Sequence, residues 1–314
     1  MSASPFHPEL RRTALLLPRH VVGPRSLAAV RAVVGLAARR QPPGVTLDRV
    51  GDVPLRVHRP AGASVNAPGP GILWMHGGGF VMGAAAQDDA LCADLARRLG
   101  AVVVAVDYRL APEHPHPGPL EDCHEALEWL AAQPDVDVGR VAVAGASAGG
   151  GLAAGLAIMA VERGVVSPAF QLLVYPMLDD RTVELPPAFD ERNARVWDPA
   201  SNRFGWRSYL GVEPASPDVP ATAAPARLDD LSRLPPAWIG VGTLDLFHRE
   251  DLAYADRLRA AGVDCDLVVV PGAFHGFDMV QGAQVVRDFR ASQLDALRAA
   301  LGVAASDSDT SDRP

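Results

Sequence analysis

The sequence predicts an α/β fold, in which a mostly parallel central sheet carries helices on both faces. Short apolar runs, rich in β-branched residues, recur at residues 72–75, 102–106, 141–144, 172–175, 238–241 and 267–270. Most of them are continuously apolar, which is typical of strands that are buried on both faces. Helical patterns alternate with these runs, at residues 88–99, 119–132, 148–163, 249–261 and 285–301. This alternation indicates a doubly wound α/β architecture.

The segments outside this alternation have patterns of their own. Residues 45–49 and 55–58 flank the dipeptide Gly51-Asp52 and predict an antiparallel hairpin at the edge of the sheet. Residues 1–44 and residues 179–226 lack strand patterns and contain one helical pattern each, at 26–40 and 201–210. We expect both segments to form a cap over the active edge of a catalytic domain at residues 45–303. The tail at residues 304–314 contains no apolar run and is expected to be disordered.

The composition excludes several classes of function. All 29 basic residues are Arg, so neither Schiff-base chemistry on a lysine nor a P-loop lysine is available. A net charge of −8 without a basic cluster argues against a nucleic-acid partner. No apolar run approaches the roughly 20 residues of a membrane span, and no export signal is evident, so we expect a soluble, cytoplasmic protein.

The cysteines do not form a recognisable site. Cys92, Cys123 and Cys265 lie far apart and include no CxxC pair, so the sequence predicts neither a disulfide framework nor a cysteine zinc site. Cys92 and Cys123 fall in helical patterns and are interpreted as packing residues. Free thiols of this kind suit a reducing compartment.

A G-x-S-x-G motif provides a candidate nucleophile. Gly145-Ala146-Ser147-Ala148-Gly149 follows the predicted strand 141–144 and opens the predicted helix 148–163. In this context the motif is typical of a nucleophile elbow, where a strained turn exposes the serine hydroxyl at the start of a helix. The alternative is a glycine-rich turn with a capping serine. Ser147 is therefore the candidate nucleophile.

A run of three glycines provides candidate oxyanion donors. His76-Gly77-Gly78-Gly79-Phe80 follows the predicted strand 72–75. Backbone amides of Gly77 and Gly78, with that of Ala148 as a third, could converge on a developing oxyanion. A flexible turn is the alternative, but a turn needs fewer than three glycines. The absence of side chains also predicts room for bulky alcohols beside the reacting carbonyl, with Gly78 adjoining that room.

A serine nucleophile needs a base, and this fold supplies acid and histidine after the elbow. Only His248 and His275 lie downstream of Ser147, and His275 follows the last predicted strand directly. We therefore expect His275 to be the base. Asp245 follows the predicted strand 238–241 and is the expected orienting acid, with a helix-capping aspartate as the alternative.

Three other acids near these positions are given no catalytic role. Glu250 and Asp251 are interpreted as solvated acids at the start of a helix, and Asp278 as a surface or supporting acid.

Together these motifs resemble the hormone-sensitive lipase family of α/β-hydrolases, in its bacterial esterase branch. The resemblance covers residues 53–301 and rests on HGGGF at 76–80, DYRLAPEHPHP at 107–117, GASAGG at 145–150, YPMLD at 175–179, GTLD at 242–245 and HGF at 275–277. It implies an α/β-hydrolase fold, the triad Ser147, Asp245 and His275, and an oxyanion hole of Gly77, Gly78 and Ala148. Ala146 departs from the family, which usually has Asp or Thr before the nucleophile.

The segment 107–117 is interpreted as structural. Its Arg109 and Glu113 are expected to pair near the oxyanion loop. His114 and His116 are separated by a proline and have no evident third ligand, so we expect no metal there.

We therefore expect a carboxylic ester hydrolase that needs no cofactor, works through an acyl-enzyme and prefers short-chain esters. Its partner is a small-molecule ester, and the sequence does not decide whether the protein is a homo-oligomer. Amide or N-acetyl hydrolysis in a biosynthetic pathway is an alternative, because the same residues cleave both bonds. A non-catalytic binding protein on the same fold is a second alternative, which the presence of His275 argues against.

Overall fold

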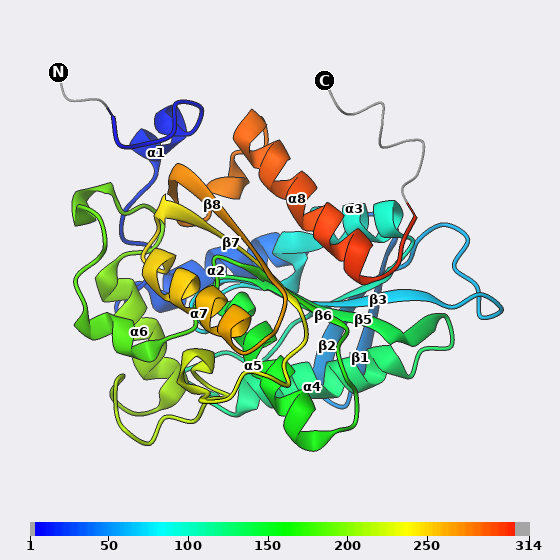
Figure 1. Ribbon diagram of the computed structural model, residues 1–314. Helices are drawn as coiled ribbons and strands as arrows, with labels where there is room; N and C mark the ends of the chain where they lie inside the picture. Colours follow the sequence, from blue (N-terminus) through cyan, green and yellow to red (C-terminus); the bar gives the residue numbers. More distant parts are fainter. Residues whose placement is uncertain (1–3, 305–314) are drawn as a thin grey trace.

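An eight-stranded sheet forms the centre of the fold (Figure 1), in the strand order β1-β2-β4-β3-β5-β6-β7-β8. The structure is a computed structural model that describes residues 4–304. The strands are β1 (Val45–Val50), β2 (Val53–His58), β3 (Gly69–Met75), β4 (Val102–Val106), β5 (Val136–Ala146), β6 (Phe170–Val174), β7 (Ala237–Leu244) and β8 (Cys265–Phe274). Strands β3 to β8 run parallel, and β1 and β2 form an antiparallel hairpin at one edge. The predicted sheet and hairpin are confirmed.

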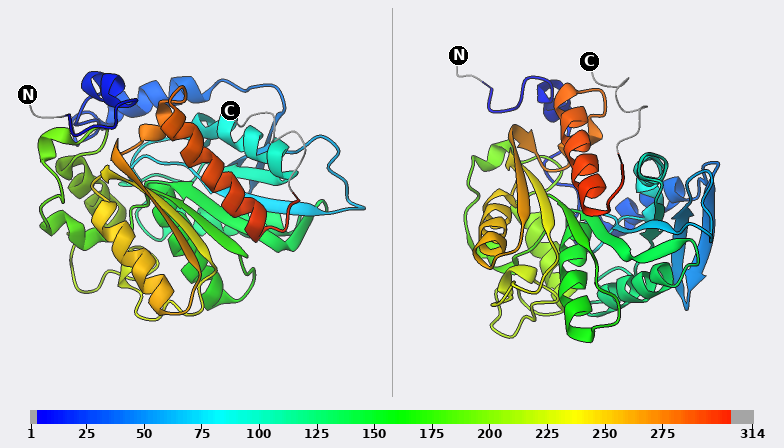
Figure 2. Two further views of the ribbon diagram at one scale, coloured as in Figure 1. Left: turned by 45° about the horizontal axis from the view of Figure 1, so that its top comes forward. Right: turned by 45° about the vertical axis from the view of Figure 1, so that its right-hand side comes forward.

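Helices cover the sheet in two layers, as the views in Figure 2 show. Core side chains of α3 (Asp89–Leu99) and α8 (Gln284–Ala300) pack in one apolar cluster. Those of α4 (Gly118–Ala131), α5 (Ala148–Arg163) and α7 (His248–Ala260) pack in the other, on the opposite face. The strands between the two clusters are buried on both faces, which explains their continuous apolar runs.

The expected cap segments contact each other. The first contributes α1 (Arg11–Leu16), which the sequence did not predict, and α2 (Leu27–Ala38). The second contributes α6 (Pro199–Leu210) and short 3₁₀ turns, Asp180–Glu184 and Glu191–Asn193.

Hydrogen bonds join the two segments: the Val196 amide donates to the Pro18 carbonyl at 2.9 Å, and the Ser201 hydroxyl donates to the Val22 carbonyl at 3.0 Å. The division into cap and catalytic domain stays a prediction. The predicted disorder at 305–314 lies outside the described residues.

The structure also shows where the three cysteines lie and whether the described helices and side chains could span a membrane or bind a metal. Cys92, Cys123 and Cys265 are buried and free, and Cys92 and Cys123 belong to the apolar clusters, as predicted. Within residues 4–304, no helix has the length and apolar character that a bilayer crossing requires, and no group of three His, Cys, Asp or Glu side chains is placed to bind a metal.

A buried ion pair fixes the start of α3 to the hairpin. The Arg56 guanidinium on β2 donates to Asp89 Oδ1 at 2.8 Å and to Oδ2 at 2.5 Å. His58 Nε2 lies 3.3 Å from Asp89 Oδ1, and burial lowers the pKa of His58. Arg56 and Asp89 are only 6% and 5% exposed, so each charge depends on the other for compensation.

Replacing Asp89 with Ala should lower the free energy of unfolding by about 3–5 kcal/mol, because Arg56 would keep a buried charge without its partner. Urea unfolding of purified protein measures the change. Asp94→Ala, on the exposed face of the same helix, is the control and should shift stability by no more than about 0.5 kcal/mol. Equal stabilities of the two variants would contradict this account of the ion pair.

Candidate active site

Ser147 occupies a strained turn between β5 and α5. Its backbone has φ 58° and ψ −122°, a region that residues with a side chain rarely adopt. The flanking glycines explain how the turn fits. A Cβ on Gly145 would lie 2.3 Å from the Gly149 carbonyl oxygen, and a Cβ on Gly149 would lie 2.1 Å from the Met75 carbonyl oxygen. The elbow motif therefore needs glycine at both positions, as expected from its sequence.

The three residues predicted as the triad lie together. His275 Nε2 is 2.9 Å from Ser147 Oγ, and His275 Nδ1 is 2.8 Å from Asp245 Oδ2. The other Asp245 oxygen accepts a hydrogen bond of 3.0 Å from the Phe247 amide. Ser147, Asp245 and His275 directly follow the parallel strands β5, β7 and β8, so the sheet itself brings them to one edge. All three residues are at most 5% exposed.

Aromatic rings enclose the His275 imidazole. The centroids of Tyr175, Phe247 and Trp197 lie 4.9, 5.1 and 6.4 Å from that of His275. Tyr175 and Phe247 approach edge-on, which restricts rotation of the imidazole. Trp197 comes from the insertion at 179–226, a segment in which no sequence motif pointed to a site residue.

The predicted oxyanion donors line the same pocket or its edge. Gly77 and Gly78 line the pocket together with Ser147, and Ala148 is the first residue of α5. The Ala148 amide lies in the first turn, where N–H groups have no partner within the helix and the helix dipole is positive. Among the loop hydrogen bonds of residues 4–304, none uses the amides of these three residues as donors.

The glycines of this loop are needed for contacts inside the protein. Gly78 has φ +136°, and a Cβ there would lie 2.0 Å from the Met82 carbonyl oxygen. Gly79 has φ +60°, and a Cβ there would lie 2.0 Å from the Trp197 ring. A side chain at Gly78 would therefore point into the loop and not into the pocket. The expectation that the missing side chain of Gly78 makes room for the alcohol is wrong. Room for bulky alcohols stays a prediction without this support.

Neighbouring segments hold the loop in place. The Tyr108 hydroxyl donates to the His76 carbonyl at 2.7 Å. Arg31 of α2 donates to the Val81 carbonyl at 2.7 Å and pairs with Glu113 at 2.8 Å. Arg109 pairs instead with Asp122 at 2.6 Å. The expected Arg109–Glu113 pair is therefore wrong: each of the two has a partner on a different helix.

The interpretation of Glu250 and Asp251 as solvated acids is also wrong. They are 4% and 0% exposed because the first turn of α7 packs beneath the loop that follows β6. Glu250 Oε1 accepts hydrogen bonds from the Leu178 and Asp179 amides at 2.7 and 3.2 Å, and burial raises the pKa of both acids. His248 begins the same helix, and the histidine that contacts Ser147 is His275.

Asp278 has a supporting position, as interpreted from the sequence. Its two oxygens accept hydrogen bonds from the Tyr175 hydroxyl at 2.6 Å and from Arg290 at 2.8 Å. It does not contact His275, whose Nδ1 is directed to Asp245.

Ser147 opens into a pocket of about 430 Å³. Its lining comes from the loop 77–83, the start of α3, the ends of β5 and β6, both cap segments and the region 275–290. Val34, Trp74, Gln87, Asp88, Leu91, Tyr175, Val196, Trp197, Gln281 and Arg290 are among the lining residues. Most of these were not predicted from the sequence, because no motif marks them.

Comparison with known proteins identifies the family. A family model described as alpha/beta hydrolase fold matches residues 72–279, more than half of the chain. This chain belongs to that α/β-hydrolase family. The match includes the HGGG, G-x-S-x-G, GTLD and HGF motifs, and it confirms the predicted fold and the resemblance to the hormone-sensitive lipase family.

Individual members of the family are also similar. Esterase LipI of Mycobacterium tuberculosis is 39% identical over 72% of this chain and 71% of its own length. Ethyl acetate hydrolase of Pseudomonas putida is 33% identical over 72% of this chain and 71% of its own length. A bacterial heroin esterase structure superimposes with a TM-score of 0.85 at 38% identity, covering 95% of this chain and 98% of that one.

Replacing Gly78 with Ala should lower kcat/KM by roughly 10²–10³ for an ester of any alcohol, because the clash with Met82 misdirects an oxyanion donor. Kinetics with a primary and a tertiary acetate check this, with circular dichroism as the folding control. A variant that loses only the tertiary ester would contradict this role for the glycine.

Proposed function

We propose that this carboxylic ester hydrolase acts through Ser147 as nucleophile, His275 as base and Asp245 as the acid that orients the imidazole. The observation that carries the proposal is the unbroken chain of contacts, 2.9 Å from Ser147 Oγ to His275 Nε2 and 2.8 Å from His275 Nδ1 to Asp245 Oδ2. The relatives named above, an esterase and an ethyl acetate hydrolase, favour esters over amides as substrates. The intact triad contacts argue against a purely binding role.

The contacts support a two-step reaction. His275 Nε2 takes the hydroxyl proton as Ser147 Oγ forms a bond to the ester carbonyl carbon, and the amides of Gly77, Gly78 and Ala148 stabilise the oxyanion. The imidazolium then gives this proton to the departing alkoxide, which leaves as the alcohol. Water, deprotonated by His275, attacks the acyl-enzyme, and the serine regains its proton as the acid leaves. No step requires a cofactor.

The elements around the triad support pre-organisation. Both Asp245 oxygens already have donors, so the carboxylate is fixed on the imidazole. The aromatic ring contacts of His275 limit it to the orientation that reaches Ser147. A preorganised base and donor set costs no reorganisation during the reaction.

The expected partner is a small-molecule ester. Gln87, Asp88 and Arg290 give the pocket lining polar groups, which favour short acyl groups over long apolar chains. A cytoplasmic location is proposed from the three cysteines, which are buried and free.

Ser147→Ala should lower kcat for p-nitrophenyl butyrate by roughly 10⁴–10⁶, because nucleophile and base act as a unit. An unchanged circular dichroism spectrum controls for folding. Near-normal turnover by the folded variant would contradict the mechanism.

Acyl chains of about two to eight carbons should be hydrolysed faster than palmitate, because a long chain would have to desolvate the polar groups of the pocket lining. A p-nitrophenyl ester series from acetate to palmitate measures kcat/KM. Greater activity on palmitate than on butyrate would reverse the assignment.

A further inference from the structure

Asp88 is a carboxyl group in the wall of the substrate pocket with no role in the mechanism above. It occupies the N-cap position of α3, where an aspartate usually accepts a hydrogen bond from the first turn of the helix. Its side chain makes no such bond. Instead, Asp88 Oδ2 accepts a hydrogen bond of 2.8 Å from Trp74 Nε1, which comes from β3 beneath the pocket. Helix capping therefore does not account for this acid.

The charge of Asp88 has no matching cation in the described residues. Among residues 4–304, Asp88 forms no ion pair, although Arg290 lines the same pocket. Arg290 is paired with Asp278 at 2.8 Å, so its charge is already matched. The charged side chains that line the pocket, Asp88, Asp278 and Arg290, therefore sum to one unmatched negative charge.

Asp88 is half-buried in the pocket wall, so its carboxylate is only partly hydrated. Desolvation raises the pKa of Asp88 to about 6, against the lowering effect of the Trp74 hydrogen bond. Asp278 and Asp89 raise it further, and Arg290 lowers it. A cation bound at this half-buried carboxylate would be attracted more strongly than in bulk water, because the pocket wall reduces the screening by solvent. Near pH 8 the group is ionised and able to bind one.

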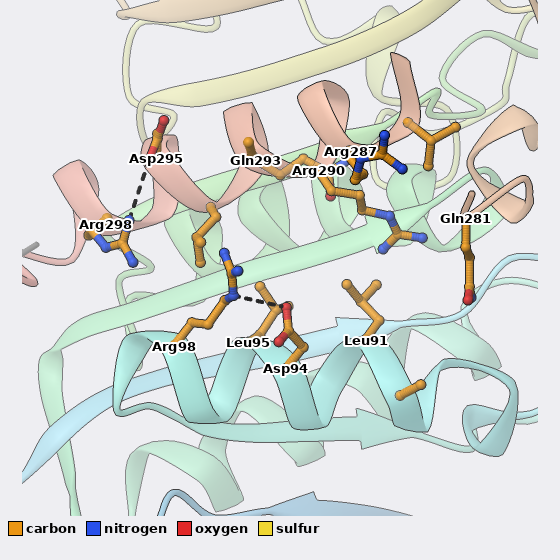
Figure 3. Close-up of a pocket in the computed structure, with 14 residues that line it drawn as sticks. Leu91, Asp94, Leu95, Arg98, Gln281, Arg287, Arg290, Gln293, Asp295 and Arg298 are labelled. Carbon is orange, nitrogen blue, oxygen red and sulfur yellow. Dashed lines mark hydrogen bonds and ion pairs between the residues drawn. The ribbon is translucent and has the colours of Figure 1, made fainter. Parts of the chain in front are cut away.

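The pocket has room for such a group beyond the reacting ester. Leu91, Gln281 and Arg290 line both the pocket and a neighbouring groove of about 630 Å³ between α3 and α8. Figure 3 shows Arg290 projecting from α8 toward this junction, with Leu91 and Gln281 at the same end of the groove. The pocket and the groove therefore adjoin at these three side chains, which leaves space beyond the pocket wall for substituents several bonds from the carbonyl.

We propose that Asp88 is a specificity-determining residue that binds an ammonium group on the ester substrate. The contacts that carry this proposal are its place in the wall of the Ser147 pocket, its single hydrogen bond to Trp74 and the pairing of Arg290 with Asp278. The proposal rests on the esterase function given above and adds the chemical class of the substrate: esters with a cationic nitrogen in the acyl or the alcohol part.

Matched substrates that differ only in charge test the proposal. One pair places the charge in the acyl part: the p-nitrophenyl esters of 4-(trimethylammonio)butyrate and of its carbon isostere, 5,5-dimethylhexanoate. The second pair places it in the alcohol part: acetylcholine and 3,3-dimethylbutyl acetate. The readout is the ratio of kcat/KM for the cationic ester to that for the neutral ester, at pH 8. A protein that hydrolyses no neutral ester would contradict the esterase function rather than the role of Asp88.

In the wild type, at least one pair should give a ratio above one. Asp88→Asn, whose amide oxygen can still accept the Trp74 hydrogen bond, should reduce that ratio by about 10-fold, mainly through KM of the cationic ester. Asp52→Asn removes the same charge from an exposed position that lines neither the pocket nor the groove, and it should preserve the ratio. The wild-type ratio should also fall as the pH is lowered through about 6, where the Asp88 carboxyl becomes protonated.

The proposal is overturned if the wild type prefers the neutral ester in both pairs. It is also overturned if Asp88→Asn lowers kcat/KM for both members of a pair equally, since that is the result of a purely structural role. Equal loss of the ratio in Asp52→Asn would assign the preference to the general field of the protein, which contradicts a specific contact.

Discussion

The strained backbone at Ser147 is the constraint on which the site depends. A residue with φ 58° and ψ −122° persists only where its surroundings hold it, and here three backbone hydrogen bonds do so. The Ser147 amide donates to the Val174 carbonyl, and its carbonyl accepts from the amides of Gly151 and Met177, at 2.9–3.0 Å. These bonds tie the elbow to the end of β6 and to α5. The hydroxyl is thereby held at the sheet edge where His275 also lies.

The two cap segments hold the oxyanion loop and form part of the wall of the substrate pocket. Arg31 of α2 fixes the oxyanion loop through the Val81 carbonyl, and Trp197 of the insertion packs on Gly79 and faces His275. Substrate selection and positioning of the donors therefore share residues. A change in either cap segment should affect both the choice of ester and the rate, because the oxyanion loop and the cap residues line the same pocket.

The sequence was informative where chemistry requires a local motif. Ser147, Gly77, Gly78 and Ala148 belong to short motifs with fixed strand or helix neighbours, so their placement followed from local patterns. His275 and Asp245 could be chosen because parallel strands end at one edge. The contacts of Arg109, Glu113, Glu250 and Asp251 could not be predicted, since each depends on which helix packs against it. Trp197 and Asp88 were missed because nothing in their sequence neighbourhood differs from that of an ordinary loop or helix start.

Covalent trapping tests the central claim most directly, namely that the elbow presents Ser147 to His275 as the reactive nucleophile. A p-nitrophenyl alkylphosphonate should phosphonylate one residue per chain, release one equivalent of p-nitrophenol and abolish esterase activity. Peptide mass spectrometry should locate the adduct on Ser147, and Asp245→Asn should slow its formation. An adduct at any other residue, or full loss of activity with Ser147 unmodified, would contradict the account.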